Sequence, residues 1–276
     1  MFRELRFEVL GPIRGWHGMT ELELGSPQQR AVLAMLLLAR GRHVSMDGLI
    51  DGLWGVHVPR SATGTVRTYV SRLRRILDIG ADGQHGELIR SIGDGYALHL
   101  GPAHLDLDAF ERWLSEARAA RDSRDTARGA LLLREALGLW RGTALAGVPG
   151  PYADSRRVPL AELHIAATEE KAAADIALGE LAAAIAELRA LLAEHPFREK
   201  LVELLMLALY KSGRQAEALH VFDSLRRRLT DELGIDPGPA LQTMQQRVLR
   251  ADPALIHEAS PRAPLPAPAA SVPMVA

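Results

Sequence analysis

Apolar and polar residues alternate near the start of the chain, and a period of two is typical of β-strands. Leu5, Phe7 and Val9 alternate with charged residues, and shorter alternating runs cover residues 13–16 and 19–24 after a Gly-Pro pair. Short runs of this kind, separated by turn residues, predict a small antiparallel sheet.

The hydrophobic period then changes to about 3.6 residues, which predicts helices. Ser26, followed by a proline, is a predicted N-cap with Gln29 as its capping-box partner, and this helix is expected to stop at Gly41. Ser45 is placed to cap a shorter helix whose apolar residues recur at helical spacing until Gly55. Two helices are therefore predicted directly after the sheet.

A third helix is expected from Ser61 to Leu77, and its two faces differ in chemistry. One face carries an apolar stripe: Ala62, Val66, Val70, Leu73 and Leu77. The other face carries glycine, hydroxyl groups and arginines: Gly64, Thr68, Ser71 and Arg75, flanked by Arg67, Arg72 and Arg74. Residues 60–77 contain no acid. We expect the apolar stripe to pack on the two preceding helices, which leaves the basic face accessible.

An acid-free basic helix face fits the major groove of DNA. Arginine can donate two hydrogen bonds to guanine or hold a phosphate, and Ser and Thr supply short donors. After this helix, LIRSI, the tight GDG at 93–95 and YALHL predict a β-hairpin with Arg90 placed to reach the DNA backbone. A sheet, three helices with a basic third helix, and a hairpin are together typical of a winged helix.

Each of these features also has a simpler interpretation. A basic helix face is often only a solvated surface, and Arg67 and Arg74 can pair with carboxylates elsewhere in the chain. The hairpin is also compatible with an ordinary sheet edge, and Trp54 is expected to be a core anchor rather than a ligand platform. The order of the elements favours DNA binding.

The composition limits the classes of protein that remain. A chain of 276 residues with 47% hydrophobic residues is long enough for two globular domains. The absence of cysteine excludes disulfides, thiolate metal sites and cysteine nucleophiles. No apolar run is long enough to span a bilayer and the first residues do not resemble a signal peptide, so the cytoplasm is the expected location.

The net charge of −1 conceals an uneven distribution. Residues 1–102 hold 12 Lys/Arg and 10 Asp/Glu, a net +2, and the remainder holds 21 and 24, a net −3. A near-neutral chain is thus compatible with a local basic surface that binds nucleic acid.

Beyond Leu105 the chain is rich in alanine and leucine, and one spacing recurs after 34 residues. The recurring residues are Gly179, Ala184 and Leu188, then Gly213, Ala218 and Phe222. This is the tetratricopeptide period, in which a small residue lets two antiparallel helices approach and a large one fills the groove between them. A degraded unit is expected at Thr126–Leu139 and a loop over GTALAGVPGPYAD. A helical bundle with accidental spacing is the alternative.

Domain boundaries follow from these patterns. We expect a DNA-binding domain over residues 1–102, an all-α repeat domain over 103–256 and a disordered Pro/Ala-rich tail over 257–276. Stacked repeats bind partners or form dimer contacts and seldom perform chemistry. The sequence has no phosphate-binding loop, no HExxH spacing and no recognisable set of acid, base and nucleophile. We therefore expect no enzyme activity, no catalytic residue, no cofactor and no metal site.

Several segments resemble one known family. Similarity to the OmpR-type winged helix of the Streptomyces antibiotic regulatory protein (SARP) family is seen in FEVLGPI, GSPQQRAVLAMLLL, HVSMDGLIDGLWG, TVRTYVSRLRRIL and LIRSIGDGYALHL. Similarity to its bacterial transcriptional activation domain is seen in LDLDAFERWLSEAR, EALGLWRGTALAGV and the segment from HPFREK to DPGPAL. The resemblance covers roughly residues 5–255 and implies an α-rich, two-domain protein. An OmpR-like winged helix-turn-helix (α+β) would precede an all-α, tetratricopeptide-like domain.

The resemblance also implies a function and a set of contacts. In this family the third helix enters the major groove of direct repeats near the promoter −35 region, and side-by-side protomers help to recruit RNA polymerase. DNA contacts are then expected at Thr65, Arg67, Thr68, Ser71, Arg72, Arg74, Arg75, Arg90 and Ser91. Contact with the polymerase holoenzyme is expected at the loop Val56, His57, Val58 and Pro59.

The expected partners are promoter DNA with direct repeats, RNA polymerase and a second protomer, without a membrane. A secondary-metabolite or antibiotic gene cluster is the expected target. OmpR-type relatives usually carry a receiver domain ahead of the winged helix, and larger family members continue into a nucleotide-binding domain. Because the sheet begins within the first ten residues and the Pro/Ala-rich tail comes last, we expect neither phosphorelay nor ATP-driven control.

Two alternatives to an activator stay open. One is a helical-repeat scaffold whose basic N-terminal domain has lost DNA recognition, and a binding assay with promoter DNA tests it. The other is a repressor with the same fold, which reconstituted transcription distinguishes from an activator.

Overall fold

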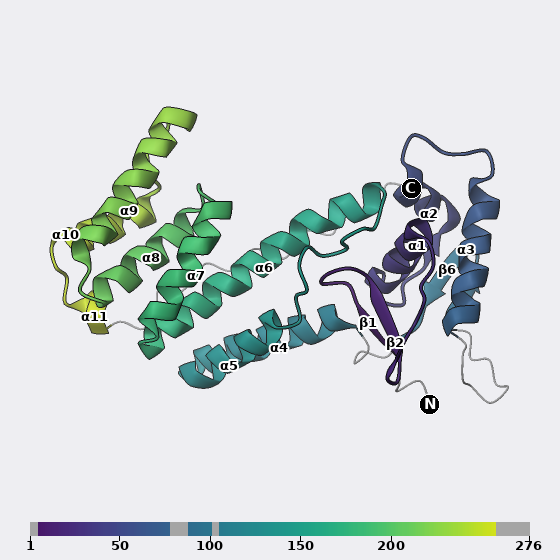
Figure 1. Cartoon of the computed structure of the whole chain (residues 1–276), viewed down its shortest axis with the longest axis horizontal. Coiled ribbons are helices and arrows are strands. Elements are labelled where there is room, and N and C mark those ends of the chain that lie inside the picture. Colours follow the sequence, from purple (N-terminus) through teal and green to yellow (C-terminus); the bar gives the residue numbers. More distant parts are fainter. Residues whose placement is uncertain (1–4, 78–87, 101–104, 258–276) are drawn as a thin grey trace. The chain divides into compact units, whose positions relative to one another are not determined.

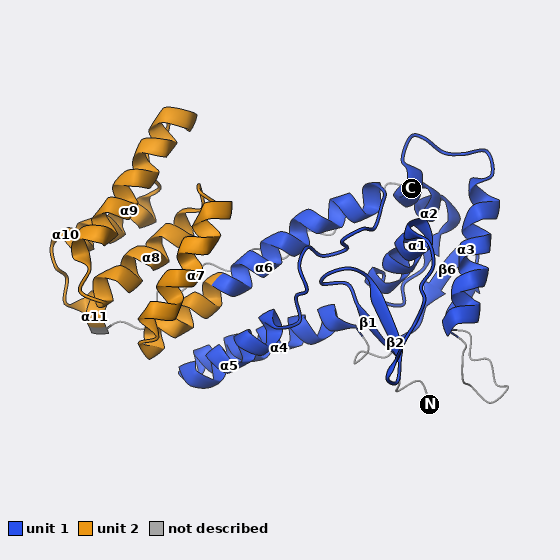
Figure 2. Ribbon diagram, in the orientation of Figure 1, with its two compact units in different colours: residues 1–168 blue, residues 169–276 orange. Residues whose placement is uncertain are grey.

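The computed structural model describes residues 5–77, 88–100 and 105–257 (Figure 1). The chain divides into two compact units, residues 1–168 and residues 169–276 (Figure 2). Among the described residues, no helix has the length and apolar character needed to cross a membrane.

The first unit begins with the predicted antiparallel sheet. Its strands are β1 (Leu5–Glu8), β2 (Arg14–His17) and β3 (Thr20–Glu21), in that order. Phe7 of β1 is fully buried, whereas Arg6 beside it is exposed. The alternation in the sequence thus reports a sheet with one buried face.

Three helices follow, α1 (Pro27–Leu38), α2 (Met46–Trp54) and α3 (Ala62–Leu77). Both predicted N-caps are confirmed, since Ser26 Oγ accepts a hydrogen bond from Gln29 N and Ser45 Oγ accepts one from Gly48 N. The buried side-chain amide of Gln29 donates to Leu24 O, so its place is set by the preceding loop rather than by a reciprocal capping box.

A second sheet contains the predicted hairpin and one strand that the pattern did not predict. Its strands are β4 (Val44–Ser45), β5 (Ile89–Ile92) and β6 (Gly95–Leu98), ordered β4-β6-β5. A Cβ atom at Gly95 would lie 2.0 Å from Val44 O, so this pairing requires glycine. We call the β5–β6 hairpin the wing.

The first unit continues with α4 (Asp106–Asp122), α5 (Thr126–Leu137) and the start of α6 (Pro151–Leu178). The buried carboxylate of Asp106 accepts hydrogen bonds from Val9 N and Leu10 N at 2.9–3.0 Å. Arg141 N and Leu145 N donate in turn to Leu10 O and Val9 O. The segments after residue 105 are therefore hydrogen-bonded to the residues that directly follow β1. The domain boundary expected at residue 102 lies outside the described residues.

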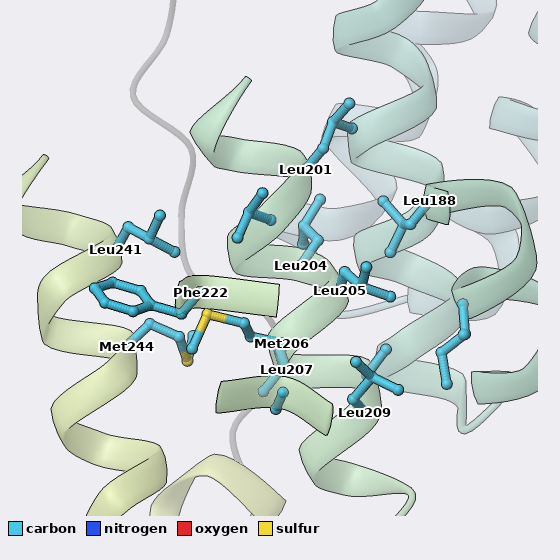
Figure 3. Close-up of a cluster of buried hydrophobic side chains, with 14 of the residues drawn as sticks. Leu188, Leu201, Leu204, Leu205, Met206, Leu207, Leu209, Phe222, Leu241 and Met244 are labelled. Atoms are coloured by element: carbon cyan, nitrogen blue, oxygen red, sulfur yellow. The ribbon is translucent and has the colours of Figure 1, made fainter. Parts of the chain in front are cut away.

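The second unit contains the rest of α6 and the helices that follow it. These are α7 (Leu181–Glu194), α8 (Glu199–Lys211), α9 (Gln215–Arg228), the π-helical turn η1 (Leu229–Leu233), α10 (Pro239–Leu249) and α11 (Ala254–His257). Helix α8 packs against α7, α9 and α10 and is buried along most of its length (Figure 3). It forms the centre of the core of this unit.

The 34-residue spacing corresponds to equivalent places in the structure. Gly179 and Gly213 end α6 and α8 with positive φ of 83° and 79°. The next helix in each case buries the predicted pair: Ala184 and Leu188 on α7, and Ala218 and Phe222 on α9. The repeat is thus a structural one and not an accident of spacing.

The earlier unit and the loop are largely as expected. Helix α5 covers most of Thr126–Leu139, and residues 141–150 are not helical. The last part of the predicted loop is wrong, because α6 already begins at Pro151, a residue favoured in the first helical turn. Of the expected tail, residues 257–276, His257 still belongs to α11, and residues 258–276 lie outside the described residues.

Candidate DNA-binding interface

Helix α3 is held by its apolar stripe. All five predicted residues are buried: Ala62, Val66, Val70, Leu73 and Leu77. The helix packs on α1 and α2, as expected (Figure 1). This packing fixes which face of α3 remains at the surface.

The opposite face of α3 presents the predicted basic and hydroxyl-bearing side chains. Five of them are exposed: Arg67, Thr68, Ser71, Arg72 and Arg75. Thr65 is half-buried, and its Oγ1 donates to Ser61 O, as Thr68 Oγ1 does to Gly64 O. With their protons committed to the helix, the two threonine hydroxyls offer an acceptor to a partner.

Arg67, Arg72 and Arg75 make no hydrogen bond or ion pair with any other residue in the described part of the chain. Among the described residues, Arg67 therefore has no carboxylate partner, contrary to the simpler interpretation of the sequence. Together these arginines place three positive charges without a described partner on one exposed helix face, where their N–H donors are accessible to acceptors such as phosphates.

Arg74 behaves differently from its neighbours. Its Nε donates to Ile89 O at 3.0 Å, and its Nη2 donates to Ser91 Oγ at 2.9 Å. The guanidinium also lies 5.6 Å from the centre of the Tyr96 ring. Arg74 thus makes intramolecular hydrogen bonds, and its partners are in the wing and are not carboxylates.

The wing carries the other two predicted contact residues. Arg90 and Ser91 on β5 are both exposed. At the turn that follows β5, Asp94 Oδ1 lies 3.3 Å from His43 Nε2. The turn therefore also contacts the segment that precedes β4. The structure therefore brings the wing and α3 into one surface region through Arg74.

One contact within this region was not predicted. Tyr69 on α3 donates its hydroxyl proton to Gln28 Oε1 at the start of α1, at 2.7 Å. The sequence places Tyr69 on the flank of the helix, but no local pattern identifies a partner 41 residues earlier. The hydrogen bond links α3 to the first turn of α1.

The predicted polymerase-contact loop joins α2 to α3. All four residues, Val56, His57, Val58 and Pro59, are exposed. Val56 retains 91% of its accessible surface and Val58 retains 47%. The loop therefore presents two apolar side chains to solvent.

Two sequence families match the chain. The family described as "Transcriptional regulatory protein, C terminal" matches residues 20–98, and the "Bacterial transcriptional activator domain" matches residues 105–249. The two matches meet beside the boundary expected near residue 102.

Individual relatives cover nearly the whole chain. The regulatory protein AfsR of Streptomyces coelicolor is 52% identical over 252 residues, 91% of this chain. The regulatory protein DnrI of Streptomyces peucetius is 34% identical over 256 residues, 91% of this chain and 94% of DnrI. The chain spans only 25% of the length of AfsR.

A solved structure has the same fold. The structure of Mycobacterium tuberculosis EmbR in complex with a low-affinity phosphopeptide superimposes with a TM-score of 0.87 at 35% identity. The match covers 92% of this chain and 68% of that one. The predicted fold class, an OmpR-like winged helix followed by a helical activator domain, is confirmed.

Proposed function

Because this chain belongs to the Streptomyces antibiotic regulatory protein family of transcriptional activators, we propose that it binds direct repeats in promoter DNA through α3 and recruits RNA polymerase. Members of this family are transcription regulators and not enzymes. The proposed place of action is the bacterial nucleoid, in the cytoplasm. The proposed targets are the genes of a secondary-metabolite or antibiotic cluster.

One observation carries the DNA-binding proposal: an exposed face of α3 bears Arg67, Arg72 and Arg75 without partners among the described residues. These guanidinium groups are hydrated in the free chain and keep their donors available, and phosphates and guanine edges are acceptors that match them. Thr68 and Ser71 lie on the same face and supply short polar contacts.

Polymerase recruitment is supported by a separate surface. Val56 and Val58 are exposed in the loop that precedes α3. Apolar side chains do not bind the charged DNA backbone, so the loop is suited to a protein partner. Protomers that bind adjacent repeats on one side of the duplex would present this loop repeatedly to polymerase.

The binding step is tested with DNA selected by the full chain from a random-sequence pool. Fluorescence anisotropy at several KCl concentrations should show binding at least ~10³-fold tighter than to a scrambled duplex, with affinity falling linearly in a log–log plot against salt. Equal affinity for both duplexes would refute sequence-specific recognition.

The arrangement of protomers is tested by spacing. Insertion of about five base pairs, half a helical turn, between two selected repeats should abolish cooperative binding, because the second protomer then faces the other side of the duplex. Insertion of a full turn of about ten base pairs is the control and should restore part of it. Cooperativity that ignores the spacing would contradict the side-by-side arrangement.

The direction of regulation is tested by reconstituted transcription with polymerase holoenzyme. We expect more transcript with the wild-type chain, and a return to the basal level when Val56→Ser and Val58→Ser are combined, with DNA affinity unchanged. Met19→Ser is a control, since Met19 is 99% exposed and lies elsewhere in the unit. A fall in transcript on adding the wild-type chain would identify a repressor instead.

A further inference from the structure

Arg74 lies between Arg72 and Arg75 in the sequence, yet the fold gives it a different environment. It is the one arginine of α3 that is half-buried rather than exposed. A planar guanidinium presents several N–H donors in a rigid fork, so that Nε and Nη2 can each meet an acceptor at a fixed separation, a geometry that the single nitrogen of a flexible ammonium group does not reproduce. Ile89 O and Ser91 Oγ, both on β5, are the two acceptors.

These contacts lie on one face of the wing. In the β5–β6 ladder Ser91 is opposite Tyr96, and Arg90 is opposite Ala97. Because side chains alternate along a strand, Ser91 and Tyr96 point to the face that Arg74 contacts, and Arg90 points to the other face. Arg74 therefore binds β5 on the face opposite to the side chain of Arg90, which stays exposed.

Arg74 also determines what Ser91 can do. The hydroxyl oxygen of Ser91 accepts a hydrogen bond from Arg74, so its own proton is free to be donated outward. Ser91 is exposed, so this proton is available to a phosphate oxygen.

We propose that Arg74 is a positioning residue that does not contact DNA, and that it sets the place of the wing, and so of Arg90 and Ser91, relative to α3. The proposal rests on the proposed function for its effect on DNA binding. Its effect on the wing is a property of the free protein. It also departs from the expectation, taken from the family resemblance, that Arg74 is itself a DNA contact.

The free protein provides the first test. In Arg74→Ala, amide hydrogen exchange of residues 89–98 should become about tenfold faster, while exchange in α1 and α2 stays unchanged, because the wing loses two hydrogen bonds. Arg75→Ala is the matched control, since Arg75 has no partner among the described residues, and it should leave exchange in the wing unaltered. Unchanged exchange in Arg74→Ala would refute the positioning role.

DNA binding provides the second test, with a duplex selected by the wild-type chain. Arg74→Ala should bind this duplex about tenfold more weakly but select the same sequence from a random pool, because no base contact is lost. Arg74→Lys keeps the charge but has one flexible nitrogen in place of Nε and Nη2, so it does not reproduce the fixed fork and should resemble the alanine variant. Wild-type affinity of Arg74→Lys would indicate a direct phosphate contact, and a changed selected sequence would indicate base reading; either overturns the proposal.

A double-mutant cycle with Arg90→Ala completes the test. If Arg74 acts by placing the wing, the two substitutions should weaken binding by less together than the product of their separate effects. Multiplicative effects would contradict it. If the wild-type chain selects no DNA, the proposed function fails, whereas the exchange measurement still decides whether Arg74 positions the wing.

Discussion

The exposed arginines of α3 differ from Arg74 because the fold leaves their donors unused. Arg72 and Arg75 are exposed and have no partner among the described residues. Their N–H donors and their charges are therefore available to a ligand. Removing either side chain should not disturb the core.

Replacing Arg72 or Arg75 with Ala should weaken binding to the selected duplex by about 1–3 kcal/mol if the side chain reads a base. If it holds a phosphate instead, the slope of log affinity against log salt should fall by about one. Anisotropy titrations across KCl concentrations separate the two cases. Arg112→Ala, an exposed arginine on α4, is the control, and wild-type binding by the Arg72/Arg75 double variant would show that another face contacts DNA.

Asp106 is the residue through which α4 is attached to the N-terminal sheet. Burial raises the pKa of its carboxyl to about 6, although three backbone N–H groups, those of Leu10, Val9 and Leu107, act in the opposite direction. The folded chain therefore binds this proton more tightly than the unfolded chain does.

This shift predicts a pH dependence of stability. The contribution of a group with a raised pKa is fully present below the unfolded value of 3.8 and is lost as the pH rises through about 6, a change of roughly 3 kcal/mol. The stability of the wild type relative to Asp106→Asn should therefore fall between about pH 4 and pH 7. Urea unfolding followed by tryptophan fluorescence measures it, since all four tryptophans lie in the first unit. The absence of a fall over this range would mean that the N–H groups hold the carboxylate ionised.

At the scale of the element, four helices end in the same way. Helices α4, α6, α8 and α10 are each followed by a residue with positive φ: Arg124, Gly179, Gly213 and Ala251. The next amide donates to the carbonyl five residues earlier, as Arg214 N does to Leu209 O. This is the pattern of a Schellman cap, in which glycine relieves the strain of the left-handed conformation.

Two of these caps provide opposite tests within the second unit. Gly213→Ala should lower the free energy of unfolding by about 1 kcal/mol, because alanine is strained at a φ of 79° and nothing lies within 4 Å to compensate. Ala251→Gly should raise it by a similar amount, because the φ of Ala251 is 51°. Urea unfolding followed by circular dichroism measures both. Changes of the same sign in the two variants would show that backbone strain does not control these helix ends.

At the scale of the whole molecule, the compact units do not coincide with the two matched families. The families meet between residues 98 and 105, whereas the compact units divide at residue 168. The hydrogen bonds of Asp106, Arg141 and Leu145 to the segment Val9–Leu10 explain the difference, because they attach the start of the activator domain to the winged-helix sheet.

A fragment of residues 1–168 should therefore unfold cooperatively and bind the selected duplex, whereas a fragment of residues 1–102 should be largely unfolded. The shorter fragment lacks Asp106, Arg141 and Leu145, so it loses the hydrogen bonds that these residues make with Val9 and Leu10, each of which stabilises the fold by ~0.5–1.5 kcal/mol. Tryptophan fluorescence during urea unfolding compares the two. Equal unfolding midpoints would establish residues 1–102 as an independent domain, as the sequence pattern predicts.

Much of the fold and of the candidate site was predictable. The buried stripe of α3, the caps at Ser26 and Ser45 and the repeat around Gly179 and Gly213 all depend on residues within a few turns of one another. The two-residue strand β4 was not predictable, since it is too short for an alternating pattern and forms only because β6 pairs with it.

The sequence by itself determined the order of the longer elements of the winged helix, the face that α3 buries and the absence of acid from the basic face of α3. Local spacing decides these features, because helical and strand periods act over neighbouring residues. Only the tertiary structure decided that Arg74 contacts the wing 15 residues away and that Asp106 binds the backbone of Val9, 97 residues earlier in the chain. Such partners are brought together by packing of distant segments, and no local period encodes them.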